Sequence, residues 1–160
     1  MSSSRYNVTS MLVVQGNLAN TYQYLARLDD ALRLRREVYA GVLKINGEKH
    51  IVTFIEATSL SNLLVDLERN EEAKSLLRRM LPVARRVIGE NTEVTIRMRQ
   101  IYARSLVPRA GAALDDLREA VTTLEDTDRI ARRVFGSAHP IVGGIRRDLE
   151  KMRTYLQQST

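Results

Sequence analysis

The chain has 160 residues, of which 44% are hydrophobic and 28% are charged, and its formal net charge is +6. A chain of this length and hydrophobic content has enough material for one domain with a core, and its composition is not that of a disordered protein. It contains no cysteine, which excludes disulfides and thiolate metal sites, and no apolar run long enough to span a membrane.

Three glycines mark an internal repeat. Gly47, Gly89 and Gly136 each end an apolar pattern, and they are separated by 42 and 47 residues. A shift of 42 residues also places Asn20 on Asn62. Recurrence at a spacing of this size indicates stacked supersecondary units rather than a single globular pattern.

The first unit, residues 6–47, contains two helical patterns. Apolar residues recur at intervals near three, four and seven over 12–25 and again over 31–45. The second pattern opens with Asp29 and Asp30, and acidic side chains favour the positive end of a helix dipole. We therefore predict a pair of antiparallel helices joined by a tight turn.

The rest of the chain repeats this arrangement. The second unit spans 48–89, the third spans 90–136, and a final helix is predicted over 138–157. The third unit is five residues longer, and the extra residues fall within 107–113, where proline and glycine favour a longer turn. Residues 1–160 are thus predicted to form one all-α domain of about three and a half repeats.

The stretches "NLANTYQYLARLDDALRLRREVYAGVLKINGEKH" (17–50) and "FGSAHP" (135–140) resemble tetratricopeptide repeats of the kinesin light chain type. Such repeats also run 42 residues, with "NLA…Y" in the first helix, "EA" or "DA" opening the second, and "G-x-x-H-P" at the joint. The resemblance covers roughly residues 6–157, although only the third joint keeps both His and Pro. It implies a right-handed superhelical solenoid of stacked antiparallel helix pairs.

The resemblance also implies a concave groove, lined by the first helix of each unit, that holds peptides. Transferring the groove positions by repeat phase gives the following candidates: Asn20, Gln23, Tyr24, Thr58, Asn62, Asp66, Arg97, Gln100, Arg104, Arg147, Lys151 and Tyr155. An amide at the equivalent positions Asn20 and Asn62 can both donate to and accept from an extended peptide backbone.

The positive charge is concentrated in the second part of the chain. Residues 1–68 carry seven basic and seven acidic side chains, whereas residues 69–160 carry 18 basic and 12 acidic ones. Repeat phase points Arg104 and Arg147 toward the groove, and a basic groove favours an acidic partner. We expect a non-catalytic scaffold or adaptor that binds an extended, acidic peptide segment of another protein. Self-association through the open ends of the solenoid is the alternative.

Two other function classes are disfavoured. An isoelectric point near 10 and 21 arginines suggest nucleic acid, but aromatic residues are only 5% and tryptophan is absent, so bases would find few stacking partners. Catalysis is disfavoured because the chain has no glycine-rich phosphate loop, and its two histidines, His50 and His139, lie at equivalent joints. We expect no metal, no cofactor and no nucleic-acid partner.

The sequence also bears on location. No apolar run near the N-terminus is long enough for the core of a signal peptide, so we expect an intracellular, cytoplasmic protein. Import into an organelle is the alternative, because residues 1–28 combine arginine with several Ser and Thr and contain no acid.

Overall fold

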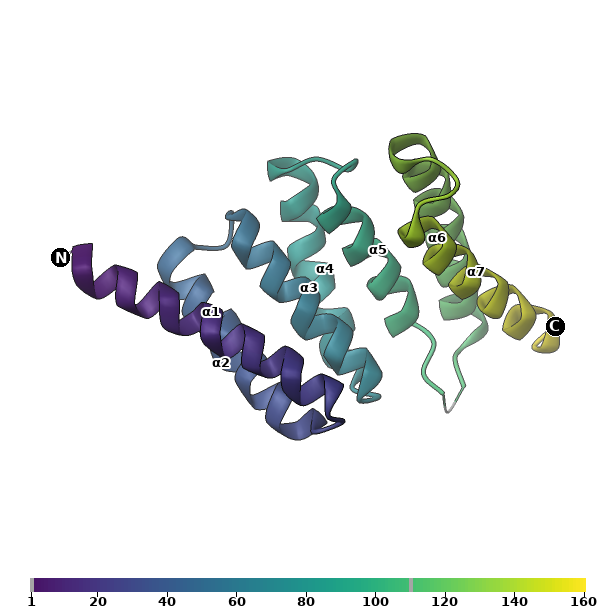
Figure 1. Ribbon diagram of the computed structural model, residues 1–160. Coiled ribbons are helices and arrows are strands. Elements are labelled where there is room, and N and C mark those ends of the chain that lie inside the picture. The colour runs from purple at the N-terminus through teal and green to yellow at the C-terminus, as the bar shows by residue number, and fades with distance from the viewer. Residues whose placement is uncertain (1, 110) are drawn as a thin grey trace.

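The computed structural model describes residues 2–109 and 111–160, and every regular element in these ranges is a helix (Figure 1). The helices are α1 (Ser2–Tyr24), α2 (Leu28–Asn46), α3 (Ile51–Asp66), α4 (Asn70–Val87), α5 (Glu93–Ser105), α6 (Leu114–Phe135) and α7 (Pro140–Gln158). None of them, over the described residues, combines the length and the hydropathy needed to cross a bilayer.

The helices stack as antiparallel pairs in two layers. The first helices α1, α3, α5 and α7 form one layer, and the second helices α2, α4 and α6 form the other (Figure 1). Each second helix packs against the first helix of its own pair and against the first helix of the next pair. The predicted all-α array of stacked helix pairs is therefore confirmed.

A glycine ends the second helix at each joint between units. Gly47, Gly89 and Gly136 have φ values of 79°, 89° and 83°, a left-handed region that L side chains seldom adopt. The hydroxyl of Thr53, in the next helix, donates to the carbonyl of Gly47 at 2.7 Å, and Thr95 donates to Gly89 in the same way at 2.8 Å. The glycine allows the chain to reverse direction. At Gly47 and Gly89 its carbonyl also accepts a hydrogen bond from the first helix of the following unit.

The two histidines cap helices at these joints. His50 Nδ1 accepts from the backbone N–H of Val52 at 3.2 Å, and His139 Nδ1 accepts from that of Ile141 at 3.3 Å. Thr92 is the capping residue at the equivalent position of the middle joint. A capping side chain satisfies one of the backbone donors left free at a helix start. The histidines therefore have a structural explanation.

The longer third unit carries its extra residues in the turn between its helices. The turns between α1 and α2 and between α3 and α4 span 25–27 and 67–69, whereas the turn between α5 and α6 spans 106–113. Arg109 in this turn donates its backbone N–H to the Glu68 carboxylate at 3.2 Å and forms an ion pair with it at 3.0 Å. The insertion thus lies at the predicted place, except for residue 110, which is outside the described residues.

The core is shared between two large clusters and one small one. Ala31, Ala73 and Ala120, which occupy equivalent positions, are completely buried. Helix α5 contributes to both large clusters, whereas the small cluster joins α1 to α2 through Leu12 and Val38. Stability therefore comes from contacts between neighbours, as in other solenoids.

Replacement of His139 by Ala is expected to lower the free energy of unfolding by about 1 kcal/mol, because the N–H of Ile141 loses its acceptor. Asn at the same position can cap the helix through its side-chain oxygen and is expected to retain most of the stability. Urea unfolding of the three proteins measures the difference. Equal losses for Ala and Asn would show that the capping bond is not the source.

Candidate functional site

The layer of first helices contains a hollow of about 370 Å³, which we call the groove hollow. Its lining comes from α1, α2, α3 and α5 and consists of Asn20, Gln23, Arg35, Thr58, Ser59, Asn62, Arg97, Gln100, Ile101 and Arg104. Seven of these residues are among the twelve predicted from repeat phase. The others, Arg35, Ser59 and Ile101, were not predicted.

Residues at equivalent repeat positions form a polar line across the groove hollow. Asn20 lies on α1, Asn62 on α3 and Arg104 on α5. Arg104 Nη1 donates to Asn62 Oδ1 at 2.9 Å, and its Nη2 pairs with Asp66 at 3.0 Å. The Nδ2 group of Asn20 has no partner among the described residues and remains available as a donor. The line therefore presents amide and guanidinium groups side by side.

Arg35 reaches the groove hollow from a second helix. Its side chain is buried between α1 and α3, and its Nη1 donates to Glu56 at 3.4 Å. Its Nη2 donates to Asn20 Oδ1 and, at 3.5 Å, to Gln23 Oε1. The buried Nε has no partner in the structure. One guanidinium therefore connects α1, α2 and α3 at the floor of the hollow.

This ion pair lies at the junction between α2 and α3. Apolar residues occupy the equivalent positions at the other two junctions, between α4 and α5 and between α6 and α7. Repeat phase places Arg35 on Leu77 and Leu124, and it places Glu56 on Met98 and Ile145. All four of these apolar residues have a relative exposure of 0%. The sequence already contains a signal for this pair, because it has charged residues at repeat positions that are apolar in the other units. Arg35 was not predicted because repeat phase assigns groove positions to first helices, whereas Arg35 lies on α2.

Burial has a clear effect on the acid of this pair. Loss of solvent around Glu56 raises the pKa of its carboxyl group above the ordinary value of 4.5, while the charge and the hydrogen bond of Arg35 act in the opposite direction. Desolvation is the larger effect. The pair therefore lies in an environment that disfavours charge. Burying the two charges there has a cost in free energy of folding.

The other arginines of the groove hollow are also paired. Arg97 Nε donates to Glu93 at 2.8 Å, one helical turn before it. Gln100 Nε2 donates to Asp148 on α7 at 2.6 Å. These carboxylates lie around the hollow but do not line it. The surface facing the hollow is thus made of three guanidinium groups, amides and hydroxyls, with no acid.

Five predicted residues lie outside the lining, and one that lines the hollow, Thr58, also supports its own helix. Tyr24 is almost fully exposed at the end of α1, and Asp66 pairs with Arg104 outside the lining. The hydroxyl of Thr58 donates to the carbonyl of Phe54 at 2.7 Å, so it supports its own helix. On α7, the Lys151 ammonium lies 5.6 Å from the centre of the Tyr155 ring. Arg147, also on α7, does not line the hollow.

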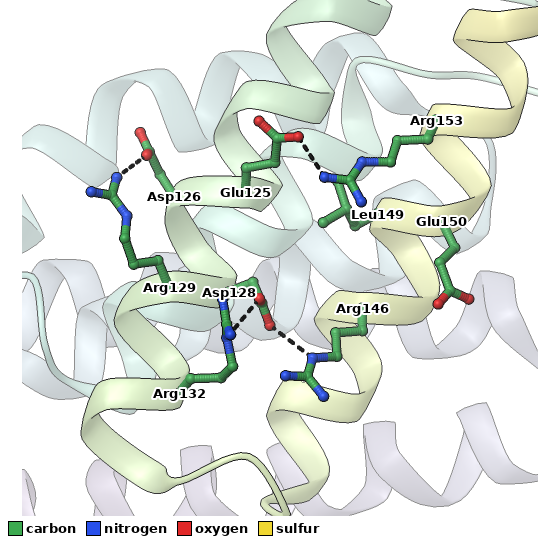
Figure 2. Close-up of a pocket in the computed structure, with 9 residues that line it drawn as sticks. All are labelled: Glu125, Asp126, Asp128, Arg129, Arg132, Arg146, Leu149, Glu150 and Arg153. Carbon is green, nitrogen blue, oxygen red and sulfur yellow. Dashed lines mark hydrogen bonds and ion pairs between the residues drawn. The ribbon is translucent and has the colours of Figure 1, made fainter.

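A larger hollow, of about 670 Å³, lies between α6 and α7 (Figure 2). Most of its charged side chains are paired with one another. Asp128 accepts from Arg132 at 2.9 Å and from Arg146 at 3.3 Å, and Arg153 pairs with Glu125 at 2.6 Å (Figure 2). Acids and arginines balance here, so this surface has no strong preference for a cation or an anion.

No group of three or more metal-ligating side chains occurs among the described residues. The groove hollow likewise contains no histidine and no pair of carboxylates. What its groups can do is donate hydrogen bonds and attract negative charge.

Comparison with known proteins identifies the class. The tetratricopeptide repeat family matches residues 12–51 and 57–92. These residues therefore carry tetratricopeptide repeats, and the predicted resemblance to the kinesin light chain type is confirmed. Domains built from these repeats are in general protein-interaction modules. No curated protein matches this chain significantly.

A solved structure shows the same architecture. BtubC (BKLC) from P. vanneervenii is 15% identical to this chain and superimposes with a TM-score of 0.68. The match covers 94% of this chain and 62% of that protein's chain. At this level of identity, the likeness establishes the fold of stacked helix pairs.

The structure predicts that the double substitution Arg35→Leu and Glu56→Met, which copies the apolar junctions, stabilises the fold by about 1–4 kcal/mol. Because the pKa of Glu56 is raised, folding favours its protonated form, so the parent loses stability as the pH rises from the ordinary carboxyl pKa of 4.5 through the raised one. The gain should therefore grow with pH across that range. Urea unfolding at several pH values measures it.

The single substitution Glu56→Met provides the control. It leaves the buried Arg35 guanidinium without a counter-charge and should destabilise the fold by about 3–5 kcal/mol. A double variant that is as unstable as this single variant would contradict the apolar equivalence of the three junctions.

Proposed function

We propose that the protein is a non-catalytic scaffold whose groove hollow binds an extended, acidic peptide segment of a partner protein. One observation carries this proposal: Arg35, Arg97 and Arg104 line the hollow and no carboxylate does. Charge complementarity of this kind selects an acidic partner and speeds its association. Arginine also binds carboxylates in a planar, two-bond geometry.

The amides support an extended conformation of the bound segment. Asn20 and Asn62 occupy equivalent positions on neighbouring first helices, and Gln100 lies on the next one. Peptide groups of an extended chain recur at regular intervals and carry one donor and one acceptor each. Side-chain amides can satisfy both, which fixes the path of the backbone while the arginines read its acidic side chains.

The existing ion pairs of the arginines do not prevent this binding. Arg97 pairs with Glu93 and Arg104 with Asp66, and the side chains of both pairs are partly exposed. Pairs of this kind contribute about 0–1 kcal/mol. A carboxylate held against the hollow by further contacts can therefore share or replace the intramolecular partner at small cost.

The cationic and aromatic residues of α7 extend the proposed path. Arg147, Lys151 and Tyr155 lie on the last first-type helix, which packs against α5. Arg147 forms no ion pair within the described chain, so its charge is available to a ligand. A segment longer than the hollow would reach these side chains.

Substitution of Arg104 by Gln is expected to weaken binding of an acidic extended peptide at least about tenfold, because one charge-assisted hydrogen bond is worth about 1.5–3 kcal/mol. The measurement is a fluorescence-anisotropy titration of peptides graded by net charge, in low and in moderate salt. Affinity should rise with negative charge and fall with salt.

Arg86 offers a matched control, because it is exposed on α4 and does not line the groove hollow. Arg86→Gln removes the same charge from the protein and should leave the affinity unchanged. Equal effects of the two substitutions would indicate a response to net charge alone, and no effect of Arg104→Gln would contradict the proposed site.

A further inference from the structure

Helix α1 and the turn that follows it expose a row of apolar side chains that we call the α1 stripe. It consists of Val8, Met11, Val14, Leu18 and Leu25, which are 38–64% exposed. From Met11 onward these residues recur at intervals of three, four and seven, so they lie on one side of the helix, as in the seam of a coiled coil. A contiguous apolar surface of this kind marks an interaction site.

The same side of the other first helices is covered. Repeat phase places Met11 on Thr53, Thr95 and Val142, and each of these three residues has a relative exposure of 0%. They are buried where α2, α4 and α6 pack on α3, α5 and α7. The α1 stripe is therefore the side of a first helix that receives another helix. No helix in the described part of the chain covers it.

The opposite end of the array does not complement the α1 stripe. The corresponding open surface, between α6 and α7, carries the paired charges of Glu125, Asp128, Arg132, Arg146 and Arg153 (Figure 2). Covering these charges with apolar side chains would remove their solvation without adding a partner. A head-to-tail contact between two arrays is therefore unfavourable, and such a contact would also generate an open filament.

A second copy of the α1 stripe is a surface that matches the first. Residues 6–26 contain no charged side chain, although 28% of the chain is charged. Two such helices bury their apolar residues against each other without leaving a charge unpaired. The second helices α2, α4 and α6 cannot take this role, because each already packs against first helices on both sides.

We propose that two copies of this chain associate through their α1 stripes about a twofold axis. The row from Val8 to Leu25 gives a helix–helix contact about 26 Å long. An isologous contact of this kind closes on itself and yields a dimer. Other side chains of α1, Asn20 and Gln23, line the groove hollow, so dimerisation is independent of the proposed peptide binding. The dimer would carry two grooves.

Sedimentation velocity over a range of concentrations tests the proposal on the full chain. We expect the parent protein to pass from its monomer mass of 18.2 kDa to twice that mass as the concentration rises. Leu18→Glu and, separately, Val14→Glu should each raise the dissociation constant of the dimer at least tenfold. Both residues are exposed in the monomer, so helix content should stay the same by circular dichroism.

Val13→Glu is the matched control, because Val13 is equally exposed on the same helix but lies about 140° around it from Leu18. It should leave dimerisation unchanged. A parent protein that stays monomeric at all concentrations would overturn the proposal. So would a dimer that persists in both stripe variants, or one that Val13→Glu weakens as much as they do. Peptide affinity measured in the same variants separates this result from any failure of the groove.

Discussion

The structure depends on one packing relation, in which each second helix covers the first helix of its own pair and that of the next pair. A single amphipathic helix pair has no partner for its outer face, so the fold exists only as a stack. The glycine joints and the capping side chains at residues 50, 92 and 139 lie where each unit meets the next. The groove hollow is a consequence of this stacking, because side chains of the first helices α1, α3 and α5 line it together.

The first junction differs from the other two in a way that connects stability with binding. A buried Arg35–Glu56 pair replaces a contact between apolar side chains, and replacement of such pairs by apolar residues is often neutral or stabilising. Stability alone therefore does not explain the pair. The same guanidinium lines the groove hollow beside Asn20 and Gln23, where the proposed peptide would contact it.

Much of the architecture could be predicted from the sequence, because the internal repeat itself indicates stacked helix pairs. The glycine spacing, the helix pairs and the place of the insertion were all predicted, and so were seven of the residues that line the hollow. Arg35 was not, because its long side chain extends from a second helix into a layer to which repeat phase does not assign it. The pair between Arg97 and Glu93 follows from a spacing of four on one helix. The pair between Arg104 and Asp66 joins residues 38 positions apart and needs the stacked structure.

The attachment of α1 determines how the array comes apart. Among the described helices, α1 lies against α2 alone, through the small cluster around Leu12, whereas α3 and α5 are enclosed on several sides. In a solenoid, segments with few neighbours open at lower free energy than the centre. Backbone amides of α1 should therefore exchange with solvent before those of α3 and α5. Any partner that covers α1 would slow this exchange, and by mass action would also extend the cooperative unit to the whole chain.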